Sequence, residues 1–107
     1  MIGPNVVIST AGHPVVPELR GNDPYQFNMP VHIGENCWIG ASVSILPGVS
    51  IGNRSVIGAG SIVTKDIPEH VVAAGNPCRI IREIGEHDSE YYFRDKRIDW
   101  DSVRAHV

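Results

Sequence analysis

Residues 33–68 read IGENCW, IGASVS, ILPGVS, IGNRSV, IGAGSI and VTKDIP, which are six consecutive units of six residues. The first position of every unit is a branched aliphatic residue, the second is mostly glycine, and the fifth is small or branched from Cys37 to Ile67. A fixed short period of this kind is typical of a solenoid, because each unit must stack on its neighbours to bury its apolar side chain.

The period of six differs from the 3.6 of a helix and from the simple alternation of a half-buried strand. Each unit is predicted to be a short extended segment followed by a turn, with its first and fifth side chains inward. Glycine suits the second position because a Cβ would obstruct the corner backbone. Three such sides close one coil of a triangular prism, so the fold class predicted is an all-β parallel β-helix. A sandwich of short strands is the alternative, but its strands do not keep one residue type at a six-residue interval.

The same register continues upstream and is then interrupted. Residues 2–7 form a full unit and residues 8–13 a weaker one, after which residues 14–30 break the pattern with several prolines. Proline cannot donate to a strand ladder, so this segment is predicted to be a loop that leaves the prism between two coils. Loops of this length are often functional, and Tyr25, Phe27 and Met29 argue against plain disorder.

The chain after the repeats is predicted to be strand, turn and strand over residues 69–84, with the turn at Gly75, followed by a short helix over residues 90–94 capped by Asp88 or Ser89. We therefore divide the chain into a hexapeptide-repeat β-helix (residues 1–84, including the loop 14–30) and a C-terminal helix and tail (residues 85–107).

Composition excludes several classes of function. The net charge of −3 gives no general attraction to nucleic acid. No apolar stretch approaches the roughly 20 residues needed to span a bilayer, and Met1 leads directly into a repeat rather than a signal peptide. Two cysteines are too few for a disulfide framework. We expect a small cytoplasmic protein without nucleic-acid or membrane partners.

His13 lies where the regular repeat gives way to the loop. Histidine changes charge near neutral pH, so a side chain placed there can serve as a general base. A solvated turn histidine remains an equal alternative on position alone. His13, His32 and His70 fall at irregular intervals, whereas a metal site needs converging ligands, so we expect no metal.

Four further segments complete a family pattern together with the hexads: STAGHP at residues 9–14, YQFNMP at 25–30, IGAGSIVTKDIP at 57–68 and VAAGNPCR at 72–79. With these segments the chain resembles the maltose and galactoside O-acetyltransferases. Those enzymes belong to the hexapeptide-repeat transferases, whose fold is a left-handed parallel β-helix. The resemblance extends to about Asp95.

The resemblance implies transfer of an acetyl group from acetyl-coenzyme A to a sugar hydroxyl, by homotrimers whose active sites lie between neighbouring prisms. His13 matches the family's general base, which takes the proton of the acceptor hydroxyl as its oxygen attacks the thioester. Because the sugar itself is the nucleophile, no acyl-enzyme and no activated serine or cysteine are required. The negative oxygen of the intermediate needs fixed donors, for which backbone N–H groups are the candidates.

The resemblance also assigns residues to the coenzyme. Ala59 matches a residue whose backbone meets the pantetheine arm, and Thr64 and Lys65 match contacts further along that arm. Arg79 and Arg82 match residues near the nucleotide phosphates, which a guanidinium can bind with two parallel hydrogen bonds. For Lys65 and Arg82, a role as ordinary solvated surface charges stays open.

Two further positions belong to the same expected site. Ala41 stands where related enzymes often have a serine near the coenzyme. Trp38 occupies the last, outward-pointing place of its unit and resembles the aromatic residue that lines the acetyl channel. An outward tryptophan on a polar prism is costly unless a partner covers it.

The front of the chain departs from the pattern. Family members carry a helical cap and a first coil before the equivalent of Ile2, and these supply an aspartate and an asparagine that hold the sugar. We expect the aspartate and the asparagine to be lacking here, and we expect the chain to bind the coenzyme better than it turns it over. The alternatives are a hexapeptide transferase with another acceptor, a truncated non-catalytic oligomerising remnant, and a zinc hydratase on the same prism.

Overall fold

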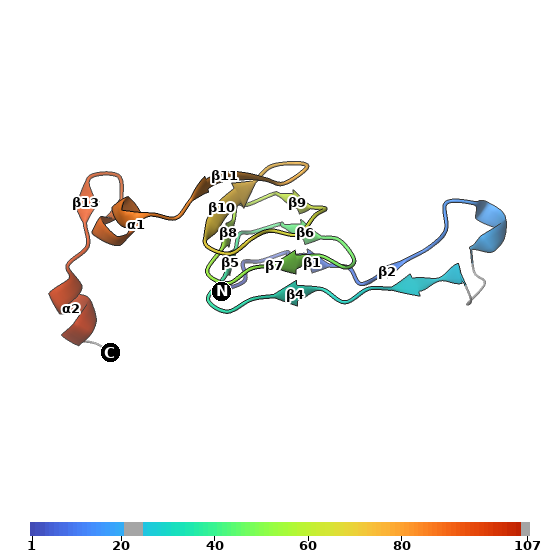
Figure 1. Ribbon diagram of the computed structural model, residues 1–107, viewed down its shortest axis with the longest axis horizontal. Coiled ribbons are helices and arrows are strands. Elements are labelled where there is room, and N and C mark those ends of the chain that lie inside the picture. The colour runs from blue at the N-terminus through green and yellow to red at the C-terminus, as the bar shows by residue number, and fades with distance from the viewer. Residues whose placement is uncertain (21–24, 106–107) are drawn as a thin grey trace.

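The computed structural model describes residues 1–20 and 25–105. The chain is built mostly of two-residue strands with a few short helices, in an elongated shape of 61 × 26 × 22 Å (Figure 1). This confirms the prediction that strands dominate the chain. Within the described residues, none of the helices combines the length and the apolar character needed to cross a membrane.

Parallel pairing links strands that lie far apart in the sequence. The strands are β1 (Val7–Ile8), β4 (His32–Ile33), β5 (Trp38–Ile39), β6 (Ser44–Ile45), β7 (Ser50–Ile51), β8 (Val56–Ile57), β9 (Ile62–Val63) and β10 (Val71–Ala74). They form three small sheets, ordered β1-β6-β9, β4-β7 and β5-β8-β10. Trp38 pairs with Val56, Ser44 with Ile62 and His32 with Ser50, so partners are 18 residues apart. The chain therefore visits the three sheets in turn, and each circuit is called a coil below (Figure 1).

Most of the core consists of the first and fifth positions of the six-residue units, and Val71, Ala73 and Cys78 extend it beyond them. Ile39, Val43 and Ile45 are fully buried, and so are the two fifth-position serines. The Ser61 hydroxyl donates to the carbonyl of Gly58 at 2.6 Å, and Ser55 donates likewise to Pro68 at 2.7 Å. A buried serine is tolerated when its hydroxyl is bonded in this way, so both serines suit the interior.

The corners of the stack depend on two different positions of the six-residue unit. The fourth position of the first five units has a left-handed φ between 56° and 80°, and the residues are Asn36, Ser42, Gly48, Arg54 and Gly60. The second-position glycines have another purpose. A Cβ on Gly40 would lie 2.7 Å from the backbone nitrogen of Ala59 in the next coil. The prediction that a Cβ would be obstructed there is confirmed, and the obstruction is the neighbouring backbone.

The interruption after β1 is an excursion, defined here as residues 9–31. It contains β2 (Ala11–Gly12), a 3-10 helix η1 (Pro17–Leu19) and β3 (Phe27–Asn28), and β2 pairs antiparallel with β3. The sequence predicts that the loop leaves the prism between two coils, and this position is wrong in detail. The excursion leaves between β1 and β4, which are two sides of the same first coil, because each of these strands pairs with the coil that follows.

The C-terminal part begins with β11 (Arg79–Glu83), which pairs antiparallel with β10 and confirms the predicted strand, turn and strand. The C-terminal arm, residues 85–105, follows with α1 (Glu86–Glu90), β12 (Tyr91–Phe93), β13 (Lys96–Arg97) and α2 (Trp100–Ala105). It projects from the stack on the side opposite to the excursion (Figure 1).

The helix predicted over residues 90–94 is wrong. Asp88 accepts a hydrogen bond from the Gly85 N–H at 2.9 Å, so α1 starts earlier, and it ends at Glu90. Tyr91 then adopts an extended backbone, and the next residues pair with β13 across a turn in which Arg94 has a φ of 51°.

Candidate functional site

Trp38 lies on the outer face of the sheet formed by β5, β8, β10 and β11. Its register partners form a column on this face, in the order Trp38, Val56, Val72 and Arg82. The neighbouring residues Ile39 and Ile57 point inward and are buried. Trp38 is therefore outward and 54% exposed, as its place in the repeat indicates.

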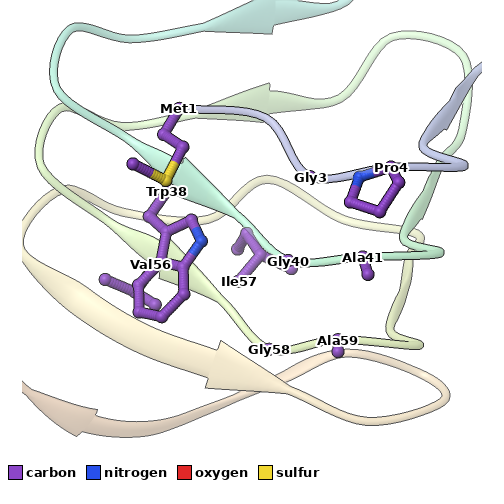
Figure 2. A pocket seen from close by; sticks show the side chains of 10 residues that line it. All are labelled: Met1, Gly3, Pro4, Trp38, Gly40, Ala41, Val56, Ile57, Gly58 and Ala59. Atoms are coloured by element: carbon purple, nitrogen blue, oxygen red, sulfur yellow. The ribbon is translucent and has the colours of Figure 1, made fainter.

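A first cavity of about 560 Å³ opens beside this tryptophan and follows the corner of the stack (Figure 2). Three of the sequence-predicted residues line it, namely Trp38, Ala41 and Ala59. Ala41 and Ala59 occupy the same corner in consecutive coils, since the N–H of Gly60 donates to the carbonyl of Ala41 at 2.8 Å. The other lining residues are apolar or lack a side chain, so polar contacts in this cavity can come only from the Trp38 indole N–H and the backbone.

A second cavity of about 530 Å³ lies between the C-terminal arm and the outer face of the same sheet. The sheet contributes Trp38 and Arg82, and the arm contributes Tyr91 and Tyr92. Because Trp38 borders both cavities, the two meet around its indole ring. The result is an apolar corner continuous with an aromatic cleft that carries one cation.

That cation is held by an acidic partner. Both terminal nitrogens of Arg82 donate to the two carboxylate oxygens of Asp88, each at 2.8 Å. The hydrogen bonds from Arg82 and from the Gly85 N–H hold the pKa of the Asp88 carboxyl well below its usual range. The same bond from Arg82 to Asp88 raises the pKa of the guanidinium. The pair is therefore fully charged over the ordinary pH range.

The remaining predicted residues do not line either cavity. His13 directly follows β2 on the excursion and is exposed. Thr64 and Lys65 follow β9 and Arg79 begins β11, all three exposed. The excursion projects away from the sheet that carries Trp38 (Figure 1). A single chain thus does not bring the candidate base to the cavity.

Both cysteines are buried free thiols. Cys37 donates to the carbonyl of Gly52 at 3.1 Å. Burial raises the pKa of the Cys78 thiol, and a hydrogen bond with Ser61 lowers it only in part. The environment of Cys78 therefore does not favour a reactive thiolate. Within residues 1–20 and 25–105, no three histidine, cysteine, aspartate or glutamate side chains gather as a metal site.

The sequence interpretation missed the arm's contribution. The sequence predicts Asp88 or Ser89 as the cap of a helix that contains Tyr91 and Tyr92, whereas Asp88 and both tyrosines line the second cavity. The available signal was Asp88 six residues after Arg82, a pair of opposite charges that a turn can bring together.

Comparison with known proteins places these features in a family. The family model for the hexapeptide repeat of succinyl-transferase matches residues 30–65. The galactoside O-acetyltransferase of Escherichia coli K12 is 59% identical over 99 residues, which are 92% of this chain and 48% of that protein. The corresponding enzyme of Lactococcus lactis is 56% identical over 94% of this chain and 48% of its own length.

Solved structures agree with these relatives. A galactoside acetyltransferase in complex with coenzyme A matches with a TM-score of 0.86 and 57% identity, over 92% of this chain and 49% of that one. A maltose O-acetyltransferase from Clostridium difficile 630 matches with a TM-score of 0.75 and 55% identity, over 79% of this chain and 45% of that one.

The chain carries the hexapeptide repeat and is similar in sequence and fold to the hexapeptide-repeat acetyltransferases. Within that class it is similar to the galactoside and maltose O-acetyltransferases, which confirms the resemblance found in the sequence. It spans about half the length of the curated relatives that it matches.

Proposed function

We propose that this chain forms part of an acetyl-coenzyme A-dependent O-acetyltransferase that acts on a hydroxyl of a maltose-, glucose- or galactoside-like sugar. The fold proposed is the left-handed parallel β-helix, supported by the 18-residue parallel register and the structural relatives. The observation that carries the functional proposal is the first cavity, in which Trp38, Ala41 and Ala59 lie together.

The residues of both cavities fit the coenzyme. Its pantetheine arm is a narrow chain of methylenes and amides, and the first cavity is walled by glycine and alanine, where short side chains allow close approach to the backbone. Its nucleotide end carries phosphates, for which Arg82 at the second cavity and Arg79 at the start of β11 are the cationic partners. Thr64 and Lys65, exposed after β9, are proposed to contact the arm between these ends.

Acetyl-coenzyme A supplies the acetyl group as a thioester. His13 is proposed to accept the proton of the acceptor hydroxyl through a ring nitrogen, while that oxygen bonds to the carbonyl carbon. The carbon–sulfur bond then breaks, and the released coenzyme thiolate takes up the proton. Trp38, which the resemblance assigns to the acetyl channel, lines the first cavity.

This site requires more than one copy of the chain. His13 lies on the excursion, which projects away from the sheet that carries Trp38 (Figure 1), so the base of one copy is proposed to serve the cavity of a neighbour. Such a head-to-tail contact closes into a ring, and the proposed ring is a homotrimer. Exposed Trp38 and Phe27, at 54% and 45%, would be covered by it.

Two measurements test the proposal together. Calorimetry should show micromolar binding of coenzyme A, and a thiol-release assay with acetyl-coenzyme A should show transfer to at least one member of a sugar panel. Absence of coenzyme binding at millimolar concentration would contradict the assignment of the cavity. Transfer to an amine in preference to every sugar would support an enzyme of the same class with another acceptor.

A further inference from the structure

The guanidinium of Arg82 is held by three hydrogen bonds that leave one of its edges open. Its terminal nitrogens donate to the two Asp88 oxygens at 2.8 Å each, and Nη1 also donates to the Glu83 carbonyl at 3.2 Å. A guanidinium has five N–H donors. Within the described residues no acceptor is recorded for the Nε–H or for the second Nη2 hydrogen. These two hydrogens form the side-on edge of the guanidinium. That edge can still donate two parallel hydrogen bonds to a ligand.

Asp88 is fixed independently of Arg82. Its Oδ2 accepts the Gly85 N–H at 2.9 Å, and its own N–H donates to the Gly85 carbonyl at 3.1 Å. The Asp88 side chain is 27% exposed, compared with 53% for Arg82. The carboxylate is therefore the better-fixed partner, and the flexible arginine takes its orientation from it.

Both residues line the second cavity, between the C-terminal arm and the face that carries Trp38. A phosphate group presents oxygens that match two parallel N–H donors, and a guanidinium held in one plane loses less entropy when it forms those bonds. Asp88 binds the end-on edge of the guanidinium, which is formed by the two terminal nitrogens. The side-on edge stays available for the phosphate, so Asp88 orients Arg82 without competing with the phosphate.

We propose that Asp88 is a positioning residue for the phosphates of the coenzyme, acting by holding the Arg82 guanidinium with its side-on edge open toward the ligand. This inference rests on the proposed function, in which Arg82 binds those phosphates. Without Asp88, the coenzyme must itself immobilise a long, rotamer-rich side chain, which costs affinity by roughly three- to tenfold.

The test compares coenzyme A with pantetheine, which lacks the phosphates, by calorimetry on the full chain. Asp88→Asn should raise the Kd for coenzyme A by about three- to tenfold and leave pantetheine binding unchanged. Asp88→Glu, which restores the carboxylate, should recover part of the loss. Glu86→Gln is the matched control, because it removes one negative charge from the first turn of the same helix, and it should change neither Kd.

A second pair of variants separates positioning from a general effect on the arm. Arg82→Ala should weaken binding of coenzyme A, and adding Asp88→Asn to that variant should cause no further loss. An equal loss in both backgrounds would overturn the inference, because Asp88 would then act through the arm alone. Coenzyme binding by Asp88→Asn as tight as that of the unmodified chain, or tighter, would also overturn it. Failure of the unmodified chain to bind coenzyme A would instead overturn the proposed function, and this inference with it.

Discussion

Gly40 packs so closely against Ala59 of the next coil that a Cβ on Gly40 would stand 2.7 Å from the Ala59 backbone nitrogen and 2.9 Å from its Cα. Both residues line the first cavity. The spacing of the coils at this corner therefore depends on a missing side chain, and the same spacing shapes the wall on which the coenzyme is proposed to lie.

Gly40→Ala should lower the free energy of unfolding by about 2–3 kcal/mol, because backbone rather than a flexible side chain obstructs the new methyl group. Gly60→Ala is the comparison. No atom lies within 4 Å of the added Cβ there, but φ is +75°, so only backbone strain of about 1 kcal/mol is expected. Urea denaturation measures both. A larger loss of unfolding free energy for Gly60→Ala than for Gly40→Ala would contradict this expectation. It would show that backbone conformation, not the spacing of the coils, decides which residues these corners accept.

The fifth-position serines predict a second effect on stability. The Ser61 hydroxyl donates to the Gly58 carbonyl at 2.6 Å and accepts from the Gly75 N–H at 3.0 Å. Ser61→Ala removes both bonds and leaves the Gly75 N–H without this partner, which should cost about 1–3 kcal/mol. Ser44→Ala, at an outward and half-buried position, should change the midpoint of thermal unfolding little. Similar losses for the two variants would contradict the role given to the Ser61 hydroxyl.

Much of the stack could be predicted from the sequence because one rule repeats. Inward positions such as Ile39 and Val43 follow from the period of six, and the buried Ser61 fits the same rule. The left-handed turns at Asn36 and Arg54 could not be predicted in this way, because several residue types occupy that fourth position and share only a backbone angle.

The site was less predictable than the stack. The first cavity depends on Ala41 and Ala59 standing at the same corner in consecutive coils beside Trp38, which the 18-residue register brings about. The second cavity depends on the direction of the C-terminal arm. The Asp88 bonds to Arg82 tie the start of the arm to β11, and they are single contacts outside any repeat.

The Arg82–Asp88 pair predicts a specific pH dependence. The pKa of Asp88 is lower in the folded chain than its ordinary value of about 3.9, so the folded state binds the proton less well than the unfolded one. The stabilising contribution is therefore fully present above about pH 4 and is lost as the pH falls through the lowered value. Carbon-detected NMR titration should find the Asp88 carboxyl ionised below pH 3.9. In Arg82→Ala its pKa should rise, and an unchanged titration there would contradict the pairing.

His13→Ala tests the proposed base. The variant should bind coenzyme A as the unmodified chain does, while acetyl transfer falls by about a hundred- to ten-thousandfold. His32→Ala is the control, since His32 is also exposed but lies on β4 of the stack. His87 is less suitable because its ring stacks on Tyr91, with 4.5 Å between ring centroids, at the second cavity. Full activity of His13→Ala would remove this residue from the mechanism.

The separation of excursion and cavity predicts that two defective chains can repair each other. His13→Ala keeps an intact cavity, whereas Trp38→Ala keeps an intact base on the excursion. In mixed trimers, a site is whole only when the cavity belongs to a His13→Ala copy and the neighbouring excursion belongs to a Trp38→Ala copy. With equal amounts of the two variants in a head-to-tail ring, this holds for about one quarter of the sites. The mixture should therefore regain about that fraction of acetyl transfer, after joint unfolding and refolding, while each variant alone stays inactive. Light scattering must confirm the trimer. Mixed trimers without recovered activity would show that base and cavity do not come from neighbouring copies.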